Sequence, residues 1–386
     1  MVSPAELRKF VAPEFVFGIG ARELVGRYAR NLGTRKLLVV TDPGVIRAGW
    51  TTQVTQNLAS ENIPFIVYSD VASNPRADQV MAGASLYRRE ACNAIVAVGG
   101  GSPMDCAKGI GIVAVSGGHI VDYQGVDEVP APLPPLICVP TTAGSGADLS
   151  QFAIVIDPQR ATKTAIISKA VVPDVALIDA ETTTTMPASL TACVGFDALT
   201  HAVEAAVSNA HSPITDLHAM EAIRCIWPNL IKAMKQPLNL DLRTTLMRGS
   251  TEAGLAFSNA SLGANHAMAH SLGGLRDAPH GECNAILLEH VVEFNYSAAP
   301  ECYDRVAQAM GLDLRGMIQG ARRAALASAI RHLRQALGFT CALGEHNVRR
   351  SDIPELARKA MSDPCMVTNP RRPTARDIEV IYEQAL

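Results

Sequence analysis

The 386-residue sequence predicts an α/β N-terminal domain with a parallel sheet, followed by an all-α C-terminal domain. In the first half, short apolar segments rich in β-branched residues alternate with segments of helical pattern. This alternation is typical of a parallel sheet covered by helices. From about Pro187 onward the strand pattern stops, and Ala- and Leu-rich helical segments are separated by prolines. We therefore predict two domains, at residues 1–185 and 186–386.

Turn and cap residues bound each expected element. The strands of the first domain are expected at residues 36–41, 63–68, 94–98 and 136–140, and the helices between them at 50–61 and 77–90. The second domain is expected to contain helices at residues 188–208, 213–234, 240–258, 281–296 and 301–310.

Composition excludes several classes of protein. Hydrophobic residues make up 48% of the chain and charged residues 18%, which indicates a globular fold with an ample core. The net charge is only −3, with 34 basic and 37 acidic residues, so we expect no nucleic-acid partner. No apolar run reaches the length of a membrane span, so we expect no membrane partner either.

The expected location is the cytoplasm. The first ten residues include Glu6, Arg8 and Lys9 and lack the apolar core of an export signal. The nine cysteines contain no C-x-x-C pair, and we interpret them as reduced thiols.

A glycine-rich loop follows the expected strand at residues 94–98. Gly99, Gly100 and Gly101 let backbone N–H groups approach a ligand, and the start of the following helix adds free donors and partial positive charge. We expect Ser102 to cap this helix and to contact phosphate, and Asp105 to lie in its first turn. The loop departs from the G-x-G-x-x-G fingerprint, and a tight turn with no ligand explains it about equally well.

A second polar loop follows the expected strand at residues 136–140. Thr141, Thr142 and Ser145 supply hydroxyl groups at the edge of the sheet where open α/β folds bind ligands. The first expected strand ends near Asp42, whose carboxylate is suited to a ribose diol and would repel a 2′-phosphate, which favours NAD over NADP. The alternative for Asp42 is an ordinary turn residue before Pro43.

Five residues of the second domain are candidate metal ligands or catalytic groups. Asp197 and His201 are spaced i, i+4, as are His266 and His270, so each pair shares one helix face. His280 lies between Pro279 and Gly281 and is expected in a loop. Imidazole and carboxylate together suit Fe²⁺ or Zn²⁺. A single histidine is more often a core or surface residue, but two compact clusters favour a metal site; spacing does not decide which of the five is not a ligand.

At these residues the chain resembles the iron-containing (group III) alcohol dehydrogenase family. The resemblance extends over nearly the whole chain, and its segments are residues 99–108, 140–146, 173–179, 195–201, 266–281 and 368–371. It implies a dehydroquinate synthase-like fold, in which an α/β nucleotide-binding domain precedes a helical metal-binding domain with a cleft between them.

The resemblance also implies roles for individual residues. It implies metal coordination by Asp197, His201, His266 and His280. It also places His270 beside the nicotinamide as a catalytic residue that relays the proton or positions the nicotinamide ribose. The cofactor contacts that it implies are Asp42, Gly99, Gly100, Gly101, Ser102, Asp105, Thr141, Thr142, Ser145 and Lys163.

The implied activity is NAD-dependent interconversion of an alcohol with an aldehyde or ketone, using Fe²⁺, with Zn²⁺ as the alternative ion. The implied partners are a small alcohol or aldehyde and a second copy of the chain, in a homodimer or larger homo-oligomer that could pair through residues 15–20. The alternatives are a related reductase, similar to maleylacetate reductase or glycerol dehydrogenase, and a regulatory or sensory homologue with weak catalysis.

Two positions depart from the family pattern. Ala147-Asp148 stands where the family usually has Ser and Glu, and Glu289 stands where it usually has proline. Glu289 adds a negative charge close in sequence to the metal segment, which weakens the expectation of the family's usual small-alcohol substrate.

Overall fold

A computed structural model describes residues 7–386 except 161, 277 and 341. The chain forms two compact units. The sheet unit comprises Val11–Met186 and Pro237–Met247, and the helical unit comprises residues 7–10, Pro187–Gln236 and Arg248–Leu386. Because the chain passes between the units more than once, a single boundary does not describe the division into units. The boundary between residues 185 and 186 therefore stays a proposal.

A six-stranded sheet forms the centre of the sheet unit, and every strand pair in it is parallel, as predicted. Its order is β1-β9-β6-β4-β2-β3. The bounds are β1 Glu14–Phe17, β2 Leu37–Val40, β3 Phe65–Tyr68, β4 Ala94–Gly99, β6 Leu136–Pro140 and β9 Val175–Ile178.

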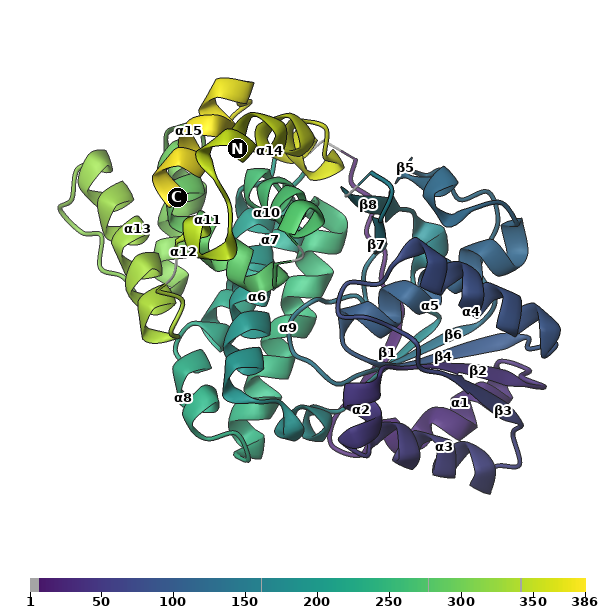
Figure 1. The fold of residues 1–386 in the computed structure, drawn as a ribbon. Helices are drawn as coiled ribbons and strands as arrows, with labels where there is room; N and C mark the ends of the chain where they lie inside the picture. The colour runs from purple at the N-terminus through teal and green to yellow at the C-terminus, as the bar shows by residue number, and fades with distance from the viewer. Residues whose placement is uncertain (1–6, 161, 277, 341) are drawn as a thin grey trace. The chain divides into compact units, whose positions relative to one another are not determined.

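Both faces of this sheet are covered, which explains why its central strands are apolar at every position. In β2, Leu38 and Val40 belong to one buried cluster, whereas Leu37 and Val39 belong to another. Successive side chains of a strand point to opposite faces, so a strand buried on both sides has no polar position. The covering helices are α1 Val25–Asn31, α3 Trp50–Ser60, α4 Ala77–Arg89 and α5 Gly101–Ser116; the short α2 is Pro43–Arg47 (Figure 1).

A second, three-stranded sheet was not predicted. It has the order β5-β8-β7, and β7 and β8 pair antiparallel. The bounds are β5 Gly125–Val126, β7 Phe152–Asp157 and β8 Thr162–Ile167. The polar residues around Lys163 interrupt the pattern of apolar residues expected of a strand in β8. In the pairing of β7 with β8, Lys163 lies opposite Ile156.

The helical unit contains the helices from α6 onward. The bounds are α6 Ala188–Val207, α7 Pro213–Ile226, α8 Leu230–Lys235, α9 Leu240–Ala260 (whose first residues belong to the sheet unit), α10 Ala264–Arg276, α11 His280–Asn295, α12 Pro300–Ala309, α13 Gln319–Ala336, α14 Ile353–Met361 and α15 Ala375–Ala385. The single helix predicted at 213–234 is wrong, because the chain breaks into α7 and α8 around Pro228, which lacks an N–H donor and disfavours helical backbone before it.

Helix α6 corrects the expectation that no apolar run reaches membrane length. Among the described residues, it is the one helix long and apolar enough to cross a membrane. However, 83% of its apolar window is buried inside the structure, and the helix carries Asp197, His201 and Glu204. It is therefore a core helix of the helical unit.

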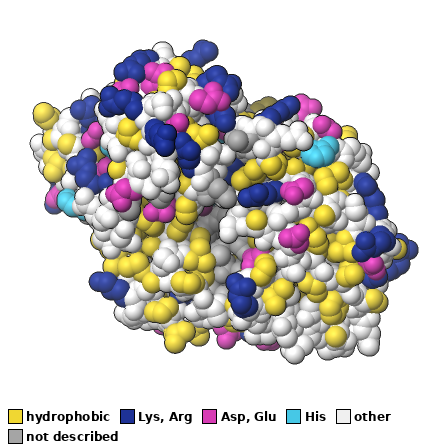
Figure 2. All heavy atoms as spheres, in the orientation of Figure 1, with side chains coloured by type: hydrophobic (Ala, Val, Ile, Leu, Met, Phe, Trp, Pro, Cys, Tyr) yellow, Lys and Arg dark blue, Asp and Glu magenta, His cyan; other side chains and the backbone are white. Residues whose placement is uncertain are grey.

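On the face drawn in Figure 2, basic and acidic side chains are interspersed.

Candidate functional site

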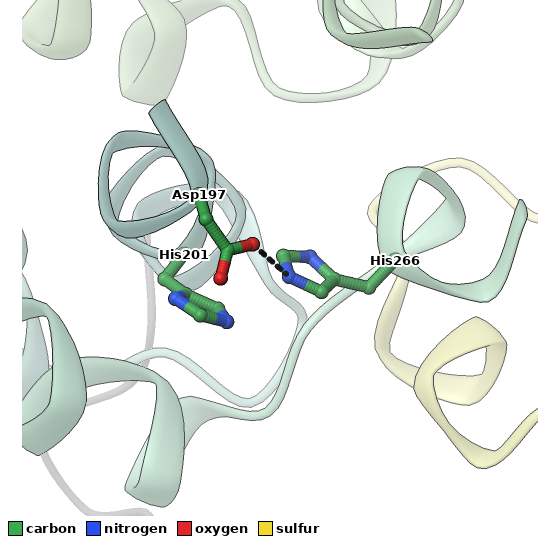
Figure 3. A group of neighbouring side chains, drawn as sticks. All are labelled: Asp197, His201 and His266. Atoms are coloured by element: carbon green, nitrogen blue, oxygen red, sulfur yellow. Dashed lines mark ion pairs between the residues drawn. The ribbon is translucent and has the colours of Figure 1, made fainter. Parts of the chain in front are cut away.

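Two helices bring three of the predicted metal ligands together. Asp197 and His201 lie one turn apart on α6, and His266 lies near the start of α10 (Figure 3). One ligand atom from each lies within 4.8 Å of the other two. The side chains are buried, and the ring of His201 stacks on that of His266 with centroids 4.5 Å apart.

His280 approaches the same carboxylate, but from a helix instead of the expected loop. It is the first residue of α11, directly after Pro279 at the N-cap. Its Nε2 lies 3.6 Å from Asp197 Oδ1, the same distance as His266 Nε2. A Cβ at Gly281 would lie 2.2 Å from the backbone oxygen of Cys193 on α6. Glycine therefore lets α11 begin close enough to α6 for His280 to reach Asp197.

A carboxylate that the sequence analysis missed holds His266. Glu204 on α6 accepts hydrogen bonds from the backbone N–H groups of Asn265, at 2.8 Å, and His266, at 3.3 Å, and it also contacts His266 Nδ1. Glu204 thus caps the first turn of α10 and directs the Nε2 edge of His266 toward Asp197. Its spacing supplied a signal, because it lies three residues after His201 on α6.

Asn284, also missed, shows that three ligand atoms point to one position. Its Nδ2 donates to Asp197 Oδ1 at 2.6 Å and lies 3.2 Å from His266 Nε2 and 3.4 Å from His280 Nε2. Its oxygen accepts from Asn265 Nδ2 at 2.9 Å, which fixes the amide's orientation. One amide group therefore contacts Asp197, His266 and His280 at once.

The carboxylates and imidazoles of this cluster shift one another's pKa values. Burial raises the pKa of Asp197, but the imidazoles of His201, His280 and His266 more than reverse this effect, and its pKa is strongly lowered. Burial lowers the pKa of His266, but Glu204 and Asp197 outweigh it and raise the pKa to about 9. Three imidazoles and one carboxylate fit Fe²⁺ or Zn²⁺.

His270 has a different environment from His266, although both lie on α10. Its Nδ1 lies 2.9 Å from Asp363 Oδ2, and its ring stacks on His280, with centroids 5.3 Å apart and an interplanar angle of 13°. It is not part of the compact group formed by Asp197, His201 and His266. The structure therefore pairs His270 with a carboxylate beside the predicted ligands.

In the sheet unit, the two predicted cofactor loops touch each other. Gly99 at the end of β4 pairs with Pro140 at the end of β6. A Cβ at Gly100 would lie 3.0 Å from Thr142 Oγ1, and one at Gly101 would lie 3.0 Å from Ser145 Oγ. The backbone N–H of Thr141 donates to the carbonyl of Gly99 at 2.8 Å. The absence of side chains at these glycines is what allows the loops to approach.

The structure corrects two expectations for α5. Ser102 does not cap this helix: Gly100 is the N-cap, no side chain caps it, and Ser102 Oγ donates to the carbonyl of Ser73. The first N–H groups of α5 are thus left without a side-chain cap. Asp105 lies beyond the first turn; it accepts the N–H of Ile154, and burial raises its pKa to about 7 although Lys108 and Lys163 oppose this shift.

Asp42 serves as the N-cap of α2. Its Oδ1 accepts hydrogen bonds from the backbone N–H groups of Gly44, at 2.7 Å, and Val45, at 3.0 Å. This is the turn role that the sequence analysis gave as the alternative, and both bonds use the same carboxylate oxygen. A contact between Asp42 and a ribose stays a proposal.

The two positions that depart from the family pattern are both buried. The carboxylate of Glu289 on α11 accepts hydrogen bonds from Arg331 Nε, at 2.6 Å, and from Arg334 Nη2, at 3.3 Å, and both arginines lie on α13. Two guanidinium groups therefore balance its negative charge. For Asp148, burial raises the pKa to about 6.

Comparison with known proteins identifies the family. Residues 12–180 match the sequence model of iron-containing alcohol dehydrogenases, and residues 191–386 match that of the C-terminal region of the Fe-containing alcohol dehydrogenase family. The chain is 39% identical over 373 residues to the 1,3-propanediol dehydrogenase of Klebsiella pneumoniae, covering 96% of each protein. It is 34% identical over 377 residues to the NAD-dependent methanol dehydrogenase of Bacillus methanolicus, covering 98% of this chain and 99% of that protein.

A solved structure agrees with this similarity. The crystal structure of a 1,3-propanediol oxidoreductase superposes with a TM-score of 0.95 at 38% identity, covering 99% of this chain and 100% of that one. The fold and the sequence thus match along the whole length, through both the sheet unit and the helical unit. The chain belongs to the iron-containing alcohol dehydrogenase family.

Proposed function

We propose that this protein is an NAD(H)-dependent oxidoreductase that interconverts a small alcohol with an aldehyde or ketone and uses one bound divalent ion, Fe²⁺ with Zn²⁺ as the alternative. The observation that carries the proposal is the convergence of buried imidazole and carboxylate groups from α6 and α10 with the partly exposed imidazole of His280 on α11. The similarity of the whole chain to alcohol dehydrogenases supports the same reaction class.

Asp197, His201, His266 and His280 would hold the ion. When bound, the ion supplies Lewis acidity that lowers the pKa of the substrate hydroxyl, and NAD⁺ supplies the hydride acceptor. Glu204 keeps Nδ1 of His266 occupied, so that its Nε2 faces Asp197. The burial of Asp197, His201 and His266 limits access of water and strengthens the electrostatic interactions among them.

The cofactor would bind at the loops of the sheet unit. We assign the phosphates to Gly99, Gly100 and Gly101 and to the start of α5, because backbone N–H groups there have no side-chain cap. The hydroxyl-bearing residues of the second loop and Ser102 would add contacts. The hydroxyl-bearing residues of the second loop are Thr141, Thr142 and Ser145. We also propose that Asp42 contacts the ribose diol and that Asp105 and Lys163 contact the cofactor.

His270 is the proposed proton carrier. During alcohol oxidation its ring accepts the proton of the substrate hydroxyl, and during reduction it returns that proton. Its position one turn after His266, with its ring stacked on His280, places it beside two proposed ligands without making it one.

We also propose a homodimer in the cytoplasm. Strand β1 lies at the edge of the six-stranded sheet. Phe15 on this strand is 40% exposed and Ile19 just after it is 54% exposed. An apolar edge strand is a template for pairing with another strand, which favours association of two copies through residues 15–20.

The test is metal analysis of protein purified without oxygen, followed by NADH absorbance assays with primary alcohols, diols and aldehydes. The variant His266→Ala should lose both the metal and the activity, whereas His332→Ala, at an exposed position of α13, should keep both. Retention of metal and activity by His266→Ala would show that the ligand assignment is wrong. Tight binding of metal and NAD without turnover of any substrate would favour a sensory protein instead.

A further inference from the structure

Two histidines on α10 are each paired with a carboxylate at Nδ1. His266 is paired with Glu204 from α6, and His270 is paired with Asp363, which lies 93 residues further along the chain. The side chains of His270 and Asp363 are only 7% and 8% exposed. The proposed function gives His270 a task but gives none to Asp363.

Both oxygens of Asp363 have a defined partner. Oδ1 accepts the backbone N–H of Cys365 at 2.8 Å, which makes Asp363 the N-cap of the short 3₁₀ helix Pro364–Thr368. Oδ2 faces His270 Nδ1 at 2.9 Å. Burial raises the pKa of Asp363, but His270 and Cys365 outweigh this effect, and its pKa is lowered. An ionised carboxylate only accepts hydrogen bonds, so Nδ1 of His270 is the donor.

We propose that Asp363 is a positioning residue that holds His270 in the tautomer with the proton on Nδ1, which leaves Nε2 as the proton acceptor of the ring. The proposal rests on the proposed function for His270. A histidine that must accept a proton from a substrate hydroxyl needs an unprotonated nitrogen, and a carboxylate on the other nitrogen both fixes the ring and stabilises the imidazolium formed.

A metal site at these residues is the competing interpretation. His270, Asp363 and Cys365 place one ligand atom each within 4.8 Å of the others. Burial raises the pKa of Cys365 well above its ordinary value, which makes loss of the thiol proton to a metal more costly. The carboxylate is also already engaged by the ring and by a backbone N–H. The hydrogen-bonded pair therefore explains the group better.

The hydrogen bond from the backbone N–H of Cys365 to Asp363 Oδ1 makes Asp363→Asn a test of the tautomer of His270. If the amide oxygen keeps the N–H of Cys365, the amide NH₂ faces His270 Nδ1, which must then become an acceptor and move its proton to Nε2. The reverse orientation would set the NH₂ group against the N–H of Cys365, which is two donors in contact. The substitution therefore preserves shape while favouring the wrong tautomer.

The experiment combines spectroscopy with kinetics. Solid-state ¹⁵N NMR of histidine-labelled, zinc-loaded protein reports which ring nitrogen carries the proton, and His270→Gln assigns the signal among the ten histidines. We expect Nδ1–H in the unsubstituted protein and Nε2–H in Asp363→Asn. We also expect kcat for alcohol oxidation to fall about 100-fold or more, the usual size of a general acid–base contribution, with metal content and NAD affinity unchanged. Asp363→Glu, which keeps a carboxylate, should recover part of the loss.

Glu252→Gln is the matched control, because Glu252 Oε2 lies 2.6 Å from Nδ1 of His218 elsewhere in the helical unit. It should leave kcat unchanged. A proton on Nε2 of His270 in the unsubstituted protein would overturn the proposal even if Asp363→Asn did not fold. Unchanged tautomer and kcat in a folded Asp363→Asn would overturn it as well. Failure of the proposed function is distinct, since the unsubstituted enzyme would then oxidise no alcohol whatever the tautomer of His270.

Discussion

Replacing Glu204 with glutamine should weaken metal binding although Glu204 is not a proposed ligand. Its Oε1 accepts the N–H of Asn265, whereas its Oε2 accepts the N–H of His266 and contacts Nδ1 of the same residue. Glutamine has only one accepting oxygen. If that oxygen stays with Asn265, the amide NH₂ faces a donor at the backbone of His266 and forces Nδ1 to become an acceptor. The ring proton then moves to Nε2, the nitrogen that faces Asp197.

The size of this effect follows from the role of carboxylates behind metal-binding histidines. Loss of such a partner costs about 10- to 100-fold in metal affinity. This corresponds to about 1.4 to 2.8 kcal/mol at about 1.4 kcal/mol for each factor of ten. The assay is competition for Zn²⁺ between the protein and a chelator of known affinity, carried out at constant pH. Glu252→Gln, beside His218, is again the control and should bind Zn²⁺ like the unsubstituted protein. An affinity of Glu204→Gln within a factor of two of the unsubstituted protein would refute the reasoning.

Two further predictions concern the sheet unit. A Cβ added at Gly100 would lie 3.0 Å from Thr142 Oγ1, so the larger side chain of Gly100→Val would crowd the second loop. NAD⁺ affinity measured by calorimetry should therefore fall at least about tenfold, with metal content unchanged. The control is Gly320→Val on α13, where an added Cβ meets nothing within 4 Å, and it should leave NAD⁺ affinity unchanged. Because the pKa of Asp105 is raised to about 7, its ionisation destabilises the fold increasingly as pH rises from about 4 to 7. Asp105→Asn should therefore raise the thermal midpoint more at pH 8 than at pH 5, and an equal change at both pH values would contradict this account.

Four of the six strands of the main sheet could be predicted because burial leaves a readable pattern, whereas β1 and β9 were not among the predicted strands. The four strands β2, β3, β4 and β6 are apolar segments that end in turn residues, and the prediction located each of them. The second sheet could not be located in the same way. Strand β8 carries Thr162, Lys163 and Thr164 before its apolar residues, so its pattern is that of a polar loop until β7 is known to lie beside it.

The predicted metal ligands came from i, i+4 spacing and from the family resemblance, and the prediction did not extend to the residues behind them. Glu204 shares a helix face with His201, and Asn284 lies one turn after His280, so both had a local signal once those helices were known. Asp363 had none, because its contact with His270 joins segments 93 residues apart. The helical position of His280 was also hidden, since Pro279 and Gly281 on either side of it are typical of loops.

The most direct test of the account is a crystal structure of the metal-loaded protein with anomalous data collected at the absorption edge of the bound ion. We predict one ion bonded to Asp197, His201, His266 and His280, with His270 outside the coordination sphere and still paired with Asp363. An ion that is bound elsewhere, or that is coordinated by His270 in place of one of these four side chains, would contradict the account.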